Sequence, residues 1–315
     1  MGRFGAQAQL IAVAVGCGVI GACLYSAVLL GTPGGLILVY LTQLPLFVAG
    51  LWLGTTAVAI AGATACIVML ALSDVIAAAL FAALNAGPVV LVVRQALLAR
   101  SAPDGALRWY PPGLLMGWLT ALALGGVAVA LLLLGGPDGL QAGVREVVGH
   151  ALDRITDQRI PQRDQIAATV ALVMPGIVAA SWMVMAVING SLAQGVLARF
   201  GAAWRPSPDL AALTLPSWIT ILLGLAAAAT AFGGPSRFVG INTMIALSVP
   251  FCLAGLAVLH AAVRRLTHPA VALVIFYTVA AMFGWPLLIV AVLGLLENWL
   301  GLRRRLIPSG GQIDG

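Results

Sequence analysis

The chain has 315 residues, of which 62% are hydrophobic and only 8% are charged, and its mean hydropathy is +1.08. A soluble domain carries about 25% charged residues because its surface must be hydrated, so this composition excludes a water-soluble protein. The basic residues are all arginines in loops and at segment ends, and the net charge of +6 therefore indicates membrane orientation and lipid headgroups, with no nucleic-acid partner.

Long apolar segments follow one another along the chain, separated by short breaks rich in glycine, proline or arginine. Most approach the roughly 20 residues with which a helix crosses a bilayer. The segments cover residues 8–30, 34–51, 54–73, 75–98, 112–134, 166–189, 214–233, 239–262 and 269–300. The sequence therefore predicts an all-α polytopic membrane protein in the lipid bilayer, with about eight to ten transmembrane helices in one domain over residues 1–302.

The arginines orient the chain, because cytoplasmic loops carry an excess of positive charge. If the N-terminus is cytoplasmic, the loops around Arg100, Arg205 and Arg264 also lie inside by alternation, and the insert 135–165 lies outside. The stretch 190–213 then forms a cytoplasmic hinge between two long apolar blocks.

The side on which the C-terminus lies depends on how the last segment crosses. A single crossing by 269–300 would place the arginines that follow it outside. We expect this segment to break at Gly284–Pro286 into two short arms, or 34–51 to be re-entrant, so that 303–315 forms a cytoplasmic tail. The exact number of crossings in 34–73 and 269–300 stays open.

The insert 135–165 has a helical pattern of its own. Apolar residues recur at helical spacing from Leu140 to Ile155, which predicts an amphipathic helix on the outer membrane surface. Its opposite face carries Glu146, His150, Asp153 and Asp157. Carboxylates beside a histidine are a candidate set of ligands for a divalent cation. The alternative is a solvated polar face whose acids pair with nearby arginines.

A stripe of small residues runs along one face of the first segment. It consists of Ala14, Gly18, Ala22 and Ser26, at every fourth position. Such a stripe lets another helix approach closely. The sequence leaves open whether that helix belongs to this chain, to a second copy in a homo-oligomer or to another membrane protein.

Polar residues and prolines at membrane depth are candidates for a binding site. Gln43 lies two residues before a proline, Asn85 lies three residues before another, and Pro175 interrupts a later segment. Burying an amide in lipid costs free energy unless it faces a cavity or a partner, and broken helices supply backbone groups for binding in transporters. We expect a ligand at Gln43, Asn85 and Pro175. The alternative is proline kinks whose neighbouring amides bond to the backbone.

The glycines of Gly16–Gly21 match the Gly-x-Gly-x-x-Gly pattern of dinucleotide-binding loops. That pattern works by joining a strand to the N-terminus of a helix at the pyrophosphate. Here the glycines lie inside an apolar span, so we interpret the match as chance. Gly-x-Ser-x-Gly, His-Glu-x-x-His, Cys-x-x-Cys and Walker-type motifs are absent from the sequence. We therefore expect neither an enzyme nor a cofactor.

Several short motifs in Asn189–Trp218 resemble the YybS-like family of bacterial integral membrane proteins. They are the Asn189…Leu192 start of a short cytoplasmic helix, the Gly201…Arg205-Pro206 step and the Leu215-Pro216-x-Trp218 return to the membrane. The tail from Gly294 to Arg305 is similar to the closing helix of that family.

The resemblance implies a multi-span protein of the inner membrane of a Gram-negative bacterium, in a family without an assigned activity. More loosely, that family is similar to the substrate-binding membrane subunits of energy-coupling-factor vitamin transporters. In those subunits, small residues at every fourth position of the first helix dock the coupling subunit, a pattern that the stripe from Ala14 to Ser26 shares.

Two hypotheses for function follow. The first is a transport-type membrane protein, or a small-molecule-binding membrane subunit, with its site near Gln43, Asn85 and the break at Pro175. The second is a structural or interaction protein that transports nothing and binds a partner through its small-residue helix faces.

Overall fold

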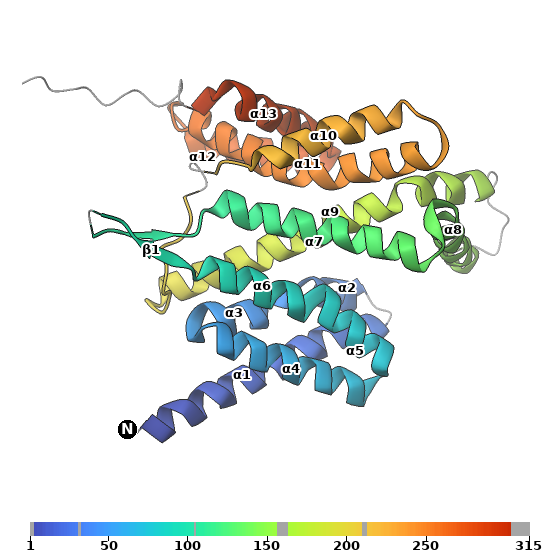
Figure 1. Ribbon diagram of the computed structural model, residues 1–315. Helices are drawn as coiled ribbons and strands as arrows, with labels where there is room; N and C mark the ends of the chain where they lie inside the picture. Colours follow the sequence, from blue (N-terminus) through green and yellow to red (C-terminus); the bar gives the residue numbers. More distant parts are fainter. Residues whose placement is uncertain (1–2, 31–32, 104, 156–162, 210–212, 304–315) are drawn as a thin grey trace, which may run out of the picture. The chain divides into compact units, whose positions relative to one another are not determined.

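The computed structural model describes residues 3–30, 33–103, 105–155, 163–209 and 213–303, and these are helical almost throughout (Figure 1). In chain order the elements are α1 (Arg3–Ser26), η1 (Ala27–Leu30), α2 (Pro33–Tyr40), α3 (Gln43–Leu53), α4 (Thr55–Leu72), α5 (Val75–Phe81), η2 (Ala82–Ala86), α6 (Gly87–Ala96), β1 (Ala99–Ser101), β2 (Leu107–Trp109), α7 (Pro112–Leu133), α8 (Gly136–Ile155), α9 (Arg163–Arg199), α10 (Ser217–Thr230), α11 (Gly234–Val263), α12 (Pro269–Phe283) and α13 (Pro286–Leu300). Of the two short η elements, η1 is a 3₁₀ turn and η2 a π-helical turn. The predicted all-α fold is confirmed, and the helix predicted in the insert is α8.

Seven helical stretches in the described part of the chain are long and apolar enough to cross a membrane. They are Gln7–Ser26, Gly34–Leu53, Thr55–Leu72, Val75–Ala96, Pro112–Leu133, Asp164–Arg199 and Gly234–Val263. An eighth forms if α12 and α13, which meet at a bend of 116°, count as one span, and α10 is a shorter apolar helix. The chain is therefore a multi-pass helical membrane protein.

Apolar side chains lie on the outside of the molecule, where a soluble protein would carry charges. Leu132, Leu133 and Met282 are 82%, 79% and 72% exposed. Contiguous exposed apolar surface is unfavourable in water, so the hydrocarbon of the bilayer must cover these side chains.

The segment 269–300, expected to break, does so, whereas 34–51, the segment expected to be re-entrant as the alternative, is nearly continuous. The break in 269–300 falls at Gly284, whose φ of 69° ends α12. In 34–51 the interruption between α2 and α3 is slight, because Leu41 and Thr42 continue the turn with hydrogen bonds to residues three positions earlier. Gly34–Leu53 consequently still counts as one span.

The described contacts divide the chain into two compact units. Unit 1 comprises Met1–Leu119 and Met183–Pro208, and unit 2 comprises Thr120–Trp182 and Asp209–Gly315. Both α7 and α9 contribute residues to each unit. The single transmembrane domain predicted over 1–302 stays a prediction, and the predicted tail lies outside the described residues from 304 onward.

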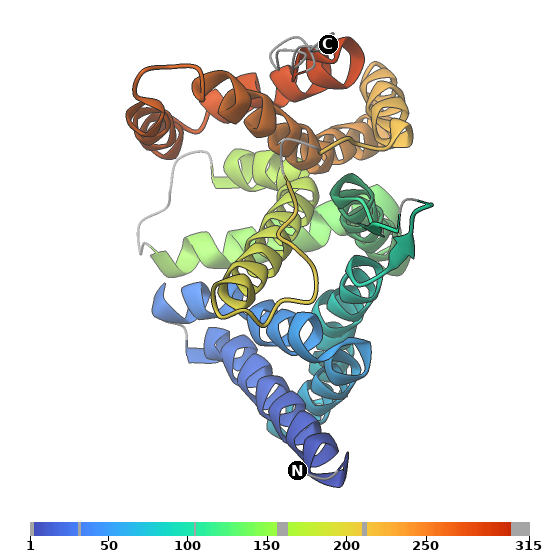
Figure 2. The same cartoon turned by 90° about the vertical axis from the view of Figure 1, so that its left-hand side faces the viewer.

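Small residues bring α1 and α4 together in unit 1 (Figures 1 and 2). Ala14 and Ala22 are fully buried, and a methyl group added at Gly18 would overlap the main-chain oxygen of Ala61 in α4. At the end of the stripe, Ser26 Oγ donates to a methionine sulfur of α4 at 3.5 Å. Of the alternatives left open for the stripe, the structure therefore shows packing against a helix of the same chain.

Glycines bring α11 and α13 equally close in unit 2. A methyl group added at Gly255 would overlap the carbonyl oxygen of Val290, and one added at Gly294 would overlap that of Phe251. Close backbone contact is the main source of helix association in lipid, where apolar side chains gain little by leaving the solvent. This crossing positions the end of α13, which forms one wall of the cavity described below.

The helix α9 is longer than a membrane crossing requires. Its 37 residues make it about 55 Å long, against about 30 Å for the hydrocarbon core of a bilayer. It continues through Asn189 to Arg199, so the irregular part of the predicted hinge 190–213 begins at residue 200. The reason is that apolar residues keep their helical spacing beyond Asn189, with Ala193 and Leu197 both buried.

One short antiparallel hairpin departs from the all-helical pattern, with β1 pairing to β2 through Arg100 and Arg108. From the sequence we expected a loop in this region. The signal was present, because Pro103-Asp104-Gly105 is a turn sequence.

We predict that Gly18→Ala destabilises the protein, because the added methyl group overlaps the backbone of α4. Overpacking of this kind typically costs about 1–3 kcal/mol. Gly16→Ala is the matched control, since nothing lies within 4 Å of a methyl group at that position. Thermal unfolding of the detergent-solubilised variants measures the difference, and equal melting temperatures would contradict the packing of α1 on α4.

Candidate functional site

The first polar cluster lies in unit 1 and contains two of the predicted binding residues. Gln43, the first residue of α3, is fully buried and donates from Nε2 to Asn85 Oδ1 at 3.4 Å and to Leu84 O at 3.3 Å. Asn85 is 3% exposed and lies in the π-helical turn η2. Such turns displace the regular backbone hydrogen bonds and occur often at functional sites. The structure thus brings Gln43 and Asn85 together.

Asn189 joins this cluster from α9. It is fully buried, and its Nδ2 donates to Tyr40 O at 2.6 Å and to Met185 O at 2.7 Å. Tyr40 is the last residue of α2, so Asn189 bonds to a carbonyl at the end of that helix. The cluster therefore surrounds the junction between α2 and α3.

Three buried oxygens at this junction have no hydrogen-bond partner: Thr42 Oγ1, Gln43 Oε1 and Asn189 Oδ1. Within the described ranges, the other buried side-chain polar atom without a partner is Arg205 Nε. Buried polar groups are nearly always satisfied, and leaving one unpaired costs about 1–3 kcal/mol. These oxygens are therefore candidates to contact a bound ligand, ion or water.

The third predicted binding residue, Pro175, lies in unit 2, where an asparagine of α11 bridges α9. Asn242 Oδ1 accepts a hydrogen bond from Gly176 N at 2.6 Å, and its Nδ2 donates to Leu172 O at 2.9 Å and to Phe238 O at 2.8 Å. Gly176 N and Leu172 O would bond to each other in an unbroken helix. Proline distorts the preceding turn, and the Asn242 amide bonds to backbone groups on both sides of Pro175.

Pro175 thus lies beside an amide that bonds to the backbone on both sides of it, and a role for it in ligand binding stays a prediction. The glycine that follows it also has a packing role, because a Cβ at Gly176 would lie only 2.8 Å from the main chain of Asn242. The structure therefore separates the predicted set: Gln43 and Asn85 meet in unit 1, and Pro175 belongs to a helix crossing in unit 2.

Three of the four predicted metal ligands, Glu146, His150 and Asp153, belong to α8. His150 Nε2 and Glu146 Oε1 are 3.8 Å apart, and both side chains are well exposed. The side chain of Asp153 and the whole of Asp157 lie outside the described residues. In the part that is described, no group of three or more His, Cys, Asp or Glu residues is placed to hold a metal ion. The metal site stays a prediction.

An arginine fastens the loop after α9 within unit 1. Arg205 is 6% exposed, and its guanidinium donates to Ala96 O, the end of α6, at 2.9 Å and to Tyr110 O at 3.5 Å. The Trp109 ring centroid is 6.0 Å from its guanidinium carbon, and Gln194 Nε2 donates to Arg205 O at 2.9 Å. Burial lowers the pKa of Arg205 because desolvation disfavours the charged form. The Arg205 side chain therefore has a structural role, because it joins the loop to the end of α6 and to the residues at the end of the hairpin.

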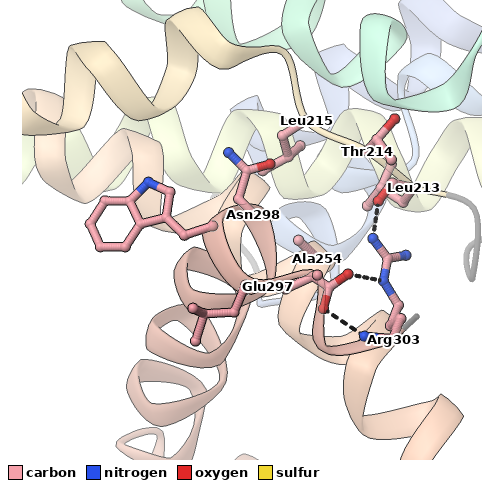
Figure 3. Close-up of a pocket in the computed structure, with 11 residues that line it drawn as sticks. Leu213, Thr214, Leu215, Ala254, Glu297, Asn298 and Arg303 are labelled. Atoms are coloured by element: carbon pink, nitrogen blue, oxygen red, sulfur yellow. Dashed lines mark hydrogen bonds and ion pairs between the residues drawn. The ribbon is translucent and has the colours of Figure 1, made fainter. Parts of the chain in front are cut away.

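Unit 2 contains a cavity of about 310 Å³ between the segment that precedes α10 and the end of α13 (Figure 3). Its walls include Leu213, Thr214 and Leu215 on one side and Glu297, Asn298 and Arg303 on the other. A cavity of this volume is at the lower end of the range that holds small ligands.

A buried ion pair lies on the wall of this cavity (Figure 3). Arg303 Nε donates to Glu297 Oε1 at 2.8 Å, and Arg303 N donates to Oε2 of the same carboxylate at 2.9 Å. The guanidinium also donates from Nη2 to Leu213 O at 2.5 Å. Both carboxylate oxygens are therefore occupied, and the pair ties the end of α13 to the chain segment before α10.

Sequence reasoning missed Thr42, Asn189, Asn242 and the Glu297–Arg303 pair as site residues. Thr42 and Asn242 carried the same signal that identified Asn85, a polar residue inside an apolar segment. Asn189 stands at the end of the apolar segment 166–189, directly before the predicted hinge, so its position did not indicate a buried group. The pairing of Glu297 with Arg303 depends on the left-handed turn at Gly301, whose conformation the sequence does not state.

We predict that Asn242→Leu destabilises the protein by about 2–4 kcal/mol, because it removes three hydrogen bonds of a buried amide, two of which join α11 to the turn of α9 around Pro175. In a Pro175→Ala background α9 can close its own hydrogen bonds, so the same substitution should cost less. A double-mutant cycle of thermal unfolding measures this coupling. Additive effects would show that Asn242 does not compensate for Pro175.

We predict that Glu297→Ala lowers stability by about 3 kcal/mol, since it leaves a buried arginine without its anion. Glu146→Ala is the control in the same unit, because Glu146 is 75% exposed and exposed pairs contribute at most about 1 kcal/mol. Both variants can be compared by thermal unfolding in one detergent. A loss no larger for Glu297→Ala than for the control would refute the buried pair.

A family model matches residues 19–297, a range that includes Thr42, Gln43, Asn85, Asn189 and Glu297. No curated protein and no solved structure matches the chain. The matched family is described as "Predicted membrane protein (DUF2232)". Since the match covers most of the chain and the structure is that of a multi-pass helical membrane protein, the chain belongs to this family of predicted membrane proteins of unknown function.

Proposed function

We propose that the protein is a transport-type membrane protein, or the small-molecule-binding membrane subunit of a transporter, and that it holds a polar solute at Gln43 and Asn85. The observation that carries the proposal is the buried contact between these two side chains, which leaves Gln43 Oε1 without a partner.

The comparison with Asn242 supports a binding role for the cluster in unit 1. Asn242 is equally buried, but both polar atoms of its amide bond to the backbone. Gln43 and Asn189 use only their amide nitrogens. A purely structural amide would be expected to satisfy both atoms, as Asn242 does. The unpartnered oxygens of Gln43 and Asn189 therefore favour a ligand that donates hydrogen bonds to them.

The free atoms favour a solute that donates hydrogen bonds. Amide oxygens are acceptors only, so hydroxyl, amide or amine groups of a solute would match them. Thr42, Gln43, Asn85 and Asn189 are all uncharged, so the cluster offers no cation to a carboxylate or phosphate. We therefore favour a neutral or cationic polar solute, and we propose no catalytic role, because no recognised catalytic motif occurs in the sequence.

The location proposed for the protein is a bacterial inner membrane, with both termini cytoplasmic. Arginines support this orientation, since Arg94, Arg100, Arg108 and Arg199 all belong to segments placed inside by alternation. The resemblance to the YybS-like family supports the inner membrane.

The second hypothesis, an interaction protein, needs a different surface from the one first considered. Because α4 covers the stripe of small residues, a membrane protein partner or a second copy would have to bind elsewhere on the chain. The exposed apolar face of α1, with Ile11 and Ile20, is available for such a contact and equally for lipid.

We predict that native mass spectrometry of the gently extracted protein finds a co-purifying polar molecule, and that adding it raises the melting temperature. Saturation at about 100 times Kd would contribute about 2.7 kcal/mol. The stabilisation should disappear in the Gln43→Leu/Asn85→Leu variant, because the solute loses its acceptors.

The control for this measurement is Asn298→Leu, which removes an amide that bonds to Thr220 Oγ1 in unit 2 and should leave the ligand effect unchanged. A solute that still stabilises the Gln43→Leu/Asn85→Leu variant would place binding elsewhere.

A further inference from the structure

We propose that the three unpartnered oxygens at the α2–α3 junction, Thr42 Oγ1, Gln43 Oε1 and Asn189 Oδ1, bind a monovalent cation of the size of sodium. We call these atoms the oxygen cluster. The inference deepens the proposed function, on which it rests, by adding an ion to the solute site of unit 1.

The hydrogen bonds of the two amide nitrogens show that the free atoms of Gln43 and Asn189 are oxygens. Gln43 Nε2 donates to Leu84 O, and Asn189 Nδ2 donates to Tyr40 O and Met185 O. Carbonyl oxygens accept hydrogen bonds and cannot donate them, so neither amide can be reversed without losing these bonds. The atoms left free are therefore oxygens, which are the ligands of hard cations.

The residues that carry the three oxygens are neighbours in the fold. Thr42 and Gln43 are consecutive, and the amide of Asn189 bonds to the carbonyl of Tyr40, two residues before Thr42. All three residues are 0% exposed. Carbonyls at the C-terminal end of α2 add partial negative charge at this junction. Unwound or interrupted helices with such carbonyls are where membrane transporters coordinate sodium.

Because the oxygen cluster carries no negative charge, it favours a monovalent cation over a divalent one. Mg²⁺ and Ca²⁺ are normally held with carboxylates, and none of the three oxygens belongs to one. A single positive charge is less costly to desolvate at membrane depth than a double one. A water molecule is the alternative occupant, because it would donate to the two amide oxygens and accept from the Thr42 hydroxyl, and the comparison of salts below distinguishes it from an ion.

Thr42 allows a clean test, because its hydroxyl has no other partner. Thr42→Val keeps the shape of the side chain and removes only the oxygen, whereas Thr42→Ser keeps the oxygen. Thermal unfolding of the purified full-length protein is measured in sodium chloride, potassium chloride and choline chloride at one ionic strength. Thr120→Val, at an equally buried threonine of unit 2, is the control.

We expect sodium to raise the melting temperature of the native protein and of Thr120→Val above the value in choline. Thr42→Val should weaken the apparent sodium affinity by about tenfold or more, the effect of losing one contact to a charged group. Thr42→Ser should restore most of it.

Three results would overturn the inference. They are equal melting temperatures of the native protein in all three salts, a sodium effect that Thr42→Val leaves intact, and a gain in stability by Thr42→Val that is the same in every salt. The last would identify an unpaired or water-bonded hydroxyl. A polar solute that stabilises the native protein while sodium does not would overturn this inference and leave the proposed function standing. Stabilisation of the native protein by sodium, with no effect of any polar solute, would support the ion and contradict the proposed solute site.

Discussion

Inside a bilayer a polar group finds no water, so every backbone or side-chain polar atom must find its partner within the protein. The organisation of both units follows from this requirement. Asn242 bonds to the backbone of α9 beside Pro175, Asn189 bonds to the last carbonyl of α2, and Arg205 bonds to the last carbonyl of α6. In each case one side chain joins two elements by a hydrogen bond to the backbone of the other.

The same requirement distinguishes structural polar residues from candidate functional ones. The Glu297–Arg303 pair and Asn242 are saturated by protein atoms, as a structural role demands. Gln43 and Asn189 are saturated on their nitrogen side only. Evolution rarely leaves a buried acceptor unpaired, so this asymmetry singles out the α2–α3 junction more sharply than polarity or depth alone.

Hydropathy determined the fold class and the position of every apolar segment, because the thickness of the bilayer dictates the length of a span. It also selected Gln43 and Asn85, since an amide in an apolar segment needs a partner. The pairing of these two residues could not be predicted, because it depends on a π-helical turn that sequence periodicity does not show. The burial of Asn189 could not be predicted either, because its polar neighbours suggested that the span ends there, whereas α9 continues to Arg199.

The bond between Gly176 N and Asn242 Oδ1 also makes the protection of one amide proton of α9 depend on a second helix. In an ordinary helix, the rate at which a central amide proton exchanges with solvent reports on the helix itself. The proton of Gly176 is held by a side chain of α11, so its protection reports on whether α9 and α11 remain in contact. A movement that parts these two helices would expose this single proton while the rest of α9 stays protected, which makes one amide a sensor of the helix crossing.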